Sequence, residues 1–207
     1  MLYPFKIIFD SIFPPTEHEL LLRNVSAERF IYWYQPKLIR ETVCLSEYNL
    51  PEVKAAITAG KFEHNYHAAR LLSALVEKYL LELPLKKTLL LPIPLSSKRK
   101  GKRGFNQVER VLRKVHHLPR SYSINTSLLI RPTDTPPQTS LAKAERIENI
   151  HGKFLFVEKN KFYLDGIERI IICDDVMTTG ATLNAAKASL VPHLDPTVEI
   201  ICLSWAH

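Results

Sequence analysis

Residues 170–183 read IIICDDVMTTGATL, and the order of residue types in this stretch decides the fold class. Isoleucines and a cysteine form a wholly apolar run, which is typical of a strand covered on both faces of a sheet. Asp174 and Asp175 follow directly, where such a strand would end. Small and hydroxyl-bearing residues then lead into a helical apolar pattern: Thr178, Thr179, Gly180, Ala181 and Thr182. A strand that passes through two acids into a helix indicates an α/β unit with a polar site at the junction.

The chemistry of this junction suits a phosphorylated sugar. Adjacent carboxylates repel each other, so they favour hydroxyl donors or a cation between them. A ribose diol, Mg²⁺, or both would meet this need. The threonines offer hydroxyl donors, Gly180 allows a tight turn, and the start of the following helix presents free backbone N–H groups to a phosphate. The stretch therefore predicts a site for a molecule shaped like ribose 5-phosphate.

Two other interpretations of the same residues stay open at this point. An aspartate at a strand end, with a threonine capping the next helix, is common in proteins without any function for that junction. Two acids after an apolar strand also suggest a receiver-type phosphoacceptor, although such a site has no use for a TTGAT loop. A nucleotide-binding P-loop is excluded, because the sequence contains no GxxxxGK[ST] motif.

The remaining sequence extends the alternation of strands and helices. Apolar periodicity predicts strands at residues 88–95, 153–157, 168–175 and 197–207, and helices at residues 2–13, 51–60, 62–83, 105–117 and 178–191. Residues 96–104, SSKRKGKRG, are polar enough to predict irregular structure, and residues 28–39 are left open between a strand and a buried loop. The pattern predicts an α/β fold with a central, mainly parallel sheet flanked by helices. Ligands of such sheets bind outside the carboxyl ends of the strands.

The composition is that of a globular protein. The chain has 207 residues, enough for one domain with a small appendage, and 46% of them are hydrophobic. No run reaches the roughly 18 apolar residues of a membrane span, and the N-terminus does not resemble a signal peptide. The cysteines at positions 44, 173 and 202 are too scattered for a disulfide framework or a zinc site. We therefore expect a protein of the reducing cytoplasm, with Cys173 and Cys202 in its core.

The positive charge of the chain is concentrated in one segment. The net charge is +7, yet residues 96–120 alone carry nine Lys or Arg residues and one acid, a net charge of +8. The other residues hold 19 bases and 20 acids. A local excess of this kind predicts an anionic partner, and the phosphates of a small molecule and those of a nucleic acid both qualify.

Residues 173–182, CDDVMTTGAT, resemble the motif with which type I phosphoribosyltransferases bind 5-phosphoribosyl 1-pyrophosphate (PRPP). Further stretches resemble the ComF-type branch of that family: residues 59–72 (AGKFEHNYHAARLL), 91–111 (LPIPLSSKRKGKRGFNQVERV) and 135–154 (TPPQTSLAKAERIENIHGKF). The resemblance covers about residues 45–205. It implies a type I phosphoribosyltransferase-like α/β domain at residues 51–207, preceded by a small N-terminal hood at residues 1–50.

The resemblance also implies roles for individual residues. Asp174 and Asp175 would hold the ribose hydroxyls, directly or through Mg²⁺, and residues 178–182 would enclose the 5-phosphate. A mobile loop would close over the site through Gln138 and Arg146. The pyrophosphate loop and its anion contacts would be Pro92, Ile93, Pro94, Leu95, Lys98 and Arg103.

The implied reaction is the displacement of pyrophosphate at ribose C1 by a nitrogen nucleophile, with Mg²⁺ and basic residues stabilising the departing pyrophosphate. ComF-type proteins are also associated with competence and DNA uptake. A second hypothesis is therefore a non-catalytic PRPP-sensing or DNA-uptake accessory protein. Its basic segment, residues 96–120, would bind single-stranded DNA, and its partners would include proteins of the competence machinery. Against DNA binding, Phe105 is the only aromatic residue of this segment.

The sequence departs from the family pattern near its N-terminus. Relatives of the ComF type commonly carry a four-cysteine zinc module there, whereas residues 12–36 contain no cysteine. We therefore expect no zinc, and a hood that is held by packing or is partly mobile. The sequence leaves open the acceptor, the occurrence of turnover and the oligomeric state, for which a dimer is one option.

Overall fold

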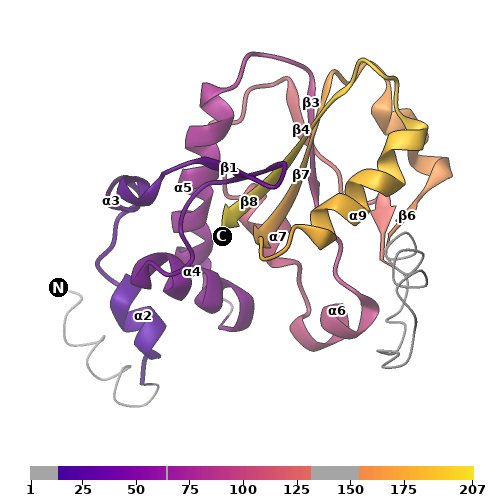
Figure 1. Cartoon of the computed structure of the whole chain (residues 1–207). Coiled ribbons are helices and arrows are strands. Elements are labelled where there is room, and N and C mark those ends of the chain that lie inside the picture. Colours follow the sequence, from indigo (N-terminus) through magenta and orange to yellow (C-terminus); the bar gives the residue numbers. More distant parts are fainter. Residues whose placement is uncertain (1–13, 64, 132–153) are drawn as a thin grey trace.

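The computed structural model of the chain describes residues 14–63, 65–131 and 154–207 (Figure 1). The helix expected at residues 2–13 lies outside these ranges, as do Gln138 and Arg146 of the expected mobile loop. Within the described ranges a central sheet carries helices on both faces. The expected α/β class is therefore confirmed.

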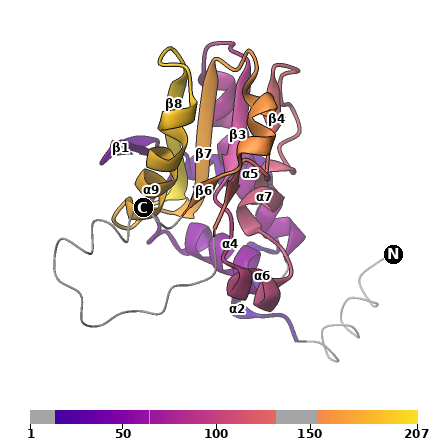
Figure 2. The same cartoon turned by 90° about the vertical axis from the view of Figure 1, so that its right-hand side faces the viewer.

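The strands of the central sheet are mainly parallel, as their apolar sequences predict. In spatial order they are β1 (Lys37–Ile39), β2 (Thr42–Cys44), β8 (Glu199–Ala206), β7 (Arg169–Val176), β3 (Thr88–Pro92) and β4 (Tyr122–Ile124). Each neighbouring pair is parallel except β1 and β2. Figure 2 shows β8, β7, β3 and β4 side by side. A second, antiparallel sheet consists of β5 (Leu129–Ile130) and β6 (Leu155–Phe156).

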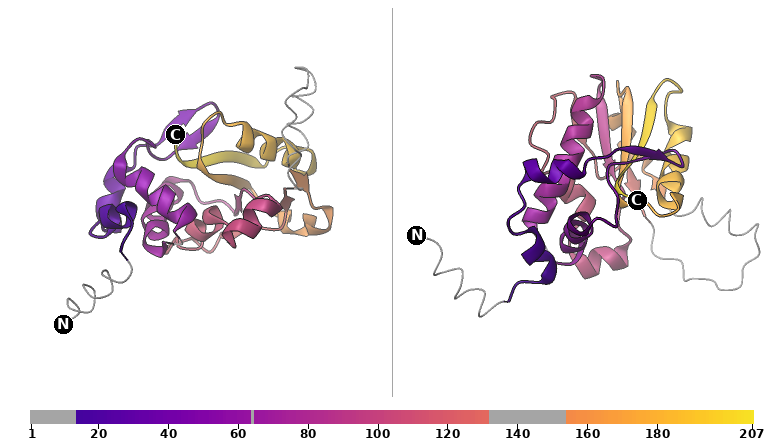
Figure 3. Two further views of the ribbon diagram at one scale, coloured as in Figure 1. Left: turned by 90° about the horizontal axis from the view of Figure 1, so that it is seen from below. Right: turned by 60° about the vertical axis from the view of Figure 1, so that its left-hand side comes forward.

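The two faces of the central sheet are covered by different helices. These are α4 (Pro51–Phe62), α5 (Tyr66–Glu82) and α7 (Gln107–Leu112) on one face and α9 (Ala181–Leu190) on the other (Figure 3). Ile171 and Cys173 of β7 belong to the core under α4, α5 and α7, whereas Ile170 and Ile172 belong to the core under α9. Successive strand residues point to opposite faces, so β7 contributes to both cores. The expected burial of Cys173 and Cys202 is confirmed.

The residues before α4 contribute to the same core and the same sheet. The first elements are α2 (Glu17–Leu22), α3 (Ala27–Phe30) and the 3₁₀ turn η1 (Ile31–Trp33). Thr16 and Ser26 cap α2 and α3 with their side chains, and Leu22 and Phe30 are completely buried. Residues 28–39, left open between strand and loop, therefore contain the end of α3, η1 and β1. The division of the chain into two parts at residue 50 stays a prediction. Strands β1 and β2, which fall in the expected hood, belong to the central sheet, because β2 pairs with β8.

The basic segment is more regular than its sequence predicts. The expectation of irregular structure at residues 96–104 is wrong, because α6 (Ser97–Arg103) forms there. Lysine and arginine are good helix formers, and Gly104 ends the helix in the left-handed conformation, with φ of 73°. The next helix is shorter than the expected 105–117, since α7 ends at Leu112. None of the helices in the described ranges is long and apolar enough to cross a membrane.

Replacement of Ile171 by alanine tests the burial of β7 under α4, α5 and α7. Ile171 is completely buried at the centre of the sheet, so we expect Ile171→Ala to lower the free energy of unfolding by about 2–5 kcal/mol. Leu38→Ala, at a 74% exposed position of β1, is the control and should change that free energy by less than about 0.5 kcal/mol. Urea denaturation followed by circular dichroism measures both variants. Equal losses would contradict this description of the core.

Candidate functional site

The carboxyl ends of β3 and β7 meet at one edge of the sheet. Pro92 of β3 pairs with Cys173 of β7, and the backbone N–H of Ile93 donates to the carbonyl of Cys173 over 2.9 Å. The PIP turn, residues 92–94, therefore lies beside the start of the acid pair. The structure thus brings the expected pyrophosphate loop and the acids together, at the edge where ligands of parallel sheets bind.

Asp174 and Asp175 lie on opposite faces of the sheet, because they are consecutive residues of a strand. Asp175 lies on the face of α4, α5 and α7, in line with Cys173. Asp174 lies on the face of α9, in line with Ile172. The two side chains leave the strand on opposite faces, yet their charges still interact.

The carboxylate of Asp175 forms an ion pair and a hydrogen bond with other side chains of the protein. The Nζ atom of Lys61 lies 3.1 Å from its Oδ1, and the side-chain amide of Gln107 donates to its Oδ2 over 2.6 Å. Arg103 in turn donates to the Oε1 atom of Gln107 over 3.0 Å. Asp175 is only 7% exposed, and these contacts supply the charge and the hydrogen bonds that a buried carboxylate needs.

Lys61 and Gln107 are absent from the site that the sequence predicts. Their contacts join helices that lie far apart in the sequence, so no local pattern reveals them. Their positions within the stretches 59–72 and 91–111, which resemble ComF-type proteins, are the signal that points to them.

Asp174 is partly exposed and has a different environment. Its Oδ1 accepts the backbone N–H of Asp175 over 2.9 Å. Burial and the negative charge of Asp175 raise the pKa of Asp174 well above its usual range. A carboxylate in such surroundings is stabilised in its charged form by a cation or by hydroxyl donors.

Asp174 has the chemistry of a magnesium ligand that acts together with a bound phosphate. Mg²⁺ prefers oxygen ligands and usually keeps several waters or substrate phosphates in its coordination shell. Within the part of the chain that the structure describes, no three His, Cys, Asp or Glu side chains cluster in a way that could hold a metal by themselves. The chemistry of Asp174 is therefore that of one oxygen ligand, which a Mg²⁺ ion could use beside water or phosphate oxygens.

The loop between β7 and α9 is open to a ligand. Gly180 adopts the left-handed conformation, with φ of 79°, and its carbonyl accepts the N–H of Asn184 to begin α9. Thr178 and Thr179 are exposed, and Thr182 is partly exposed. The hydroxyl groups of the expected phosphate loop can therefore be reached from solvent at the start of a ten-residue helix.

Asn106 connects the PIP turn to the basic segment. Its Nδ2 donates to the carbonyl of Ile93 over 2.8 Å, and its Oδ1 caps the start of α7. Of the two expected anion contacts on α6, Lys98 is exposed, whereas Arg103 is directed to Gln107. The RGFNQ stretch, residues 103–107, thus joins the PIP turn to the acid pair.

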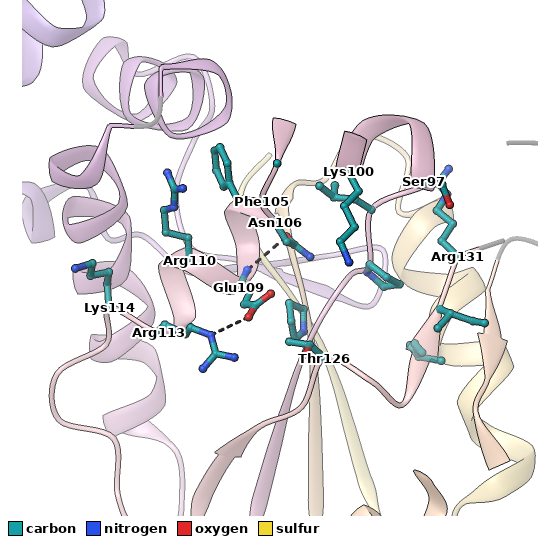
Figure 4. Close-up of a pocket in the computed structure, with 16 residues that line it drawn as sticks. Ser97, Lys100, Phe105, Asn106, Glu109, Arg110, Arg113, Lys114, Thr126 and Arg131 are labelled. Carbon is teal, nitrogen blue, oxygen red and sulfur yellow. Dashed lines mark hydrogen bonds and ion pairs between the residues drawn. The ribbon is translucent and has the colours of Figure 1, made fainter. Parts of the chain in front are cut away.

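A cavity of about 820 Å³ lies beside the PIP turn, between α6, α7 and β5 (Figure 4). Its basic lining residues are Lys100, Arg110, Arg113, Lys114 and Arg131. Its one acidic lining residue among the described side chains, Glu109, pairs with Arg113 over 2.8 Å. Neither Asp174 nor residues 178–182 line this cavity. Pro92, Pro94 and Leu95 of the expected pyrophosphate loop do line it. The cavity is therefore a positively charged hollow that adjoins this loop and suits an anion larger than a single phosphate.

Aromatic side chains from α4 and α5 lie against the basic segment. Six residues form what we call the aromatic–basic surface: Phe62, Tyr66, Arg103, Phe105, Arg110 and Lys114. The Arg110 guanidinium lies 3.4 Å from the ring centre of Phe105 and 4.9 Å from that of Tyr66, and Arg103 lies 5.0 Å from the ring centre of Phe62. Phe62 and Tyr66 are each 64% exposed. α4 and α5 therefore supply two of the three rings of this surface, and the basic segment itself supplies Phe105.

Gly180 and Gly101 offer a matched pair of substitutions. Gly180 has a left-handed backbone, so Gly180→Ala should lower the free energy of unfolding by about 1–2 kcal/mol. Gly101 is exposed within α6, with open space where a Cβ would lie, so Gly101→Ala should raise that free energy by about 0.5–1 kcal/mol. Thermal unfolding of both variants measures the two effects. Shifts of the same sign would contradict the conformation described for Gly180.

Comparison with known proteins gives relatives of three names. No family model matches the sequence. The chain is 32% identical to Competence protein F of Haemophilus influenzae over 96 residues, which are 46% of this chain and 40% of that protein. It is 34% identical to Competence protein ComFC of Bacillus subtilis over 112 residues, 52% of this chain and 40% of that protein. It is 27% identical to DNA utilization protein YhgH of Salmonella typhimurium over 175 residues, 82% of this chain and 74% of that protein. These similarities support the resemblance to ComF-type proteins.

Proposed function

We propose that this chain is a ComF-type protein that binds PRPP with Mg²⁺ and transfers its 5-phosphoribosyl group to a nitrogen acceptor. The observation that carries the proposal is the meeting of Asp174, the PIP turn and residues 178–182 at the carboxyl edge of β3 and β7. A carboxylate, a backbone turn and a helix start with hydroxyl side chains match the diol, the pyrophosphate and the 5-phosphate of PRPP. The relatives named as competence proteins support the ComF-type part of this proposal.

In this proposal each part of the site has one task. Asp174 accepts hydrogen bonds from the ribose hydroxyls and offers an oxygen to Mg²⁺, while residues 178–182 hold the 5-phosphate. The PIP turn, fixed by Asn106, orients the pyrophosphate. Mg²⁺, when bound with PRPP, would supply positive charge to the departing pyrophosphate. The bond from the acceptor nitrogen to ribose C1 forms as the bond from C1 to pyrophosphate breaks, through a state that resembles an oxocarbenium ion, and the nitrogen then loses a proton.

Asp174→Asn tests the binding step. PRPP at about 100 times its dissociation constant, with Mg²⁺, should stabilise the wild-type chain by about 2.7 kcal/mol, and most of this stabilisation should be lost in Asp174→Asn. Thermal unfolding with and without PRPP measures it. Asp165→Asn, a change at an exposed position on the turn before β7, is the matched control and should behave as wild type. No stabilisation of the wild type, or full stabilisation of Asp174→Asn, would overturn the proposal.

Turnover is tested separately from binding. Pyrophosphate release from PRPP is measured with a panel of purine and pyrimidine bases and amines. Release that depends on one acceptor supports the transferase. Stabilisation by PRPP without release from any acceptor favours a PRPP sensor built on the same site.

A second candidate function is the binding of single-stranded nucleic acid, and a specific observation favours it. The aromatic–basic surface sets exposed rings beside guanidinium groups, next to a positively charged cavity. Proteins that bind single strands without sequence preference combine such rings, on which bases stack, with basic grooves that follow the phosphates. The relative named DNA utilization protein YhgH is consistent with this function.

Tyr66→Ala tests the nucleic-acid function. Base–aromatic stacking contributes about 1–3 kcal/mol per base, so Tyr66→Ala should weaken binding of a thymidine oligonucleotide by at least about fivefold. Tyr32→Ala is the control, since Tyr32 is 77% exposed and packs edge-on against Trp33, outside the aromatic–basic surface. Fluorescence anisotropy measures the affinity at several salt concentrations, where a steep decline with salt is expected. Equal effects of the two substitutions would contradict stacking at Tyr66.

A further inference from the structure

We infer that the cavity between α6, α7 and β5 binds a nucleoside triphosphate, in addition to the PRPP proposed for the edge of β3 and β7. The inference goes beyond both proposed functions and requires neither of them to hold. It rests on three features of the cavity: basic side chains on two of its sides, aromatic rings that orient these side chains, and an apolar part of the lining.

The basic side chains enter the cavity from two sides (Figure 4). Arg110, Arg113 and Lys114 lie on the side of α7. Lys100 of α6 and Arg131, which follows β5, lie on the other side. Because the positive charge is spread across the cavity, it suits a ligand with negative charge along its length, such as a chain of phosphates.

Most of these charges are oriented without being neutralised. The Arg110 guanidinium lies 3.4 Å from the ring centre of Phe105, and that of Arg131 lies 5.6 Å from the ring centre of Phe154. A ring attracts a cation but does not cancel its charge, so the cation still attracts an anion. The one acid among the described lining residues pairs with a single base. The lining therefore keeps an excess of positive charge for a ligand.

The cavity also has an apolar part, formed by Pro94, Leu95, Leu129 and Ile130. Ile130 is 47% exposed. Phosphate groups gain nothing from such a surface, whereas a flat ring removes it from water. The volume of about 820 Å³ lies within the range of about 300–1,000 Å³ that is usual for ligands of cofactor size. A flat ring joined to a chain of phosphates is the composition of a nucleoside triphosphate.

The cavity extends beyond the site proposed for PRPP. The two adjoin at the PIP turn, which lines the cavity. Arg113, Lys114 and Thr126 also line it, and all three lie outside the stretches that resemble ComF-type proteins. Neither Asp174 nor the phosphate loop, residues 178–182, belongs to the lining. A ligand of this cavity is therefore bound beside PRPP, not in its place.

The test is isothermal titration calorimetry of the full chain with ATP, GTP, CTP and UTP. Inorganic tripolyphosphate and adenosine serve as the separate halves of such a ligand. Lys100→Gln and Arg113→Gln each remove a positive charge from the cavity. Lys102→Gln and Arg99→Gln are the matched controls, because they remove the same charge from exposed positions of α6 outside the cavity. The controls measure the long-range attraction of anions alone.

We expect at least one nucleoside triphosphate to bind. Lys100→Gln and Arg113→Gln should weaken its binding at least about tenfold, the usual effect of a lost hydrogen bond to a charged group. The controls should stay within about twofold of wild type. Tripolyphosphate should bind more weakly than the nucleotide, and adenosine should not bind. Ile130→Thr should weaken nucleotide binding about fivefold and leave tripolyphosphate binding unchanged, because it removes apolar contact only.

Asp174→Asn separates the cavity from the PRPP site. This variant should keep the nucleotide affinity of the wild type, and saturating PRPP should leave the nucleotide bound. Loss of nucleotide binding in Asp174→Asn, or complete displacement of the nucleotide by PRPP, would assign the nucleotide to the PRPP site and overturn the inference. Absence of PRPP binding in the wild type overturns the first proposed function and leaves this inference intact.

Other results also overturn the inference. These are a wild-type chain that binds none of the nucleotides, equal effects of Lys100→Gln and Lys102→Gln, and tripolyphosphate that binds as tightly as the nucleotides. A thymidine oligonucleotide is the last arm of the test. If Lys100→Gln and Arg113→Gln weaken its binding as strongly as that of the nucleotide, the cavity belongs to a nucleic-acid surface and not to a nucleoside triphosphate.

Discussion

The parallel pairing of β7 with β3 and β8 is the constraint on which the rest of the structure depends. It aligns Pro92 with Cys173 and Asp174 with Ser204, so the ends of the strands form one edge. A parallel sheet requires helices on both faces, which is why residues 89–92 of β3 and 170–173 of β7 are apolar. Polar residues can then appear only where the strands emerge. The candidate site lies at this edge for that reason.

The pleat of β7 places the side chains of Asp174 and Asp175 in different environments. Two adjacent carboxylates in a loop would share one environment, but in a strand they point to opposite faces. Asp174 is left partly exposed on the face of α9, while Asp175 enters the core under α4, α5 and α7 and requires Lys61 and Gln107 there. Repulsion between the two charges is reduced by this separation and by the lysine. One acid therefore lies partly exposed at the edge of the sheet, and the other belongs to a buried polar network.

Much of the fold follows from the sequence, and the exceptions have physical causes. The strands at residues 88, 168 and 197 and the helix after Gly180 are predicted because long apolar runs and a strong periodicity leave few alternatives. β4 and β5 are not predicted, because strands of three and two residues are too short to show an alternation of apolar and polar residues. α6 is missed because a polar, glycine-bearing segment indicates a loop, although Gly104 completes a helix cap. Phe62 and Tyr66 meet the basic segment through packing of helices, which no local pattern reveals.

The sequence by itself determines the class of the fold, the edge at which a ligand would bind and the concentration of positive charge in residues 96–120, because burial periodicity, turn chemistry and charge are local properties of the chain. Only the tertiary structure decides which acid is buried, what neutralises its charge, and where the aromatic partners of the arginines come from. These depend on contacts between α4, α7 and β7, elements more than forty residues apart, whose meeting is set by the packing of helices on one face of the sheet.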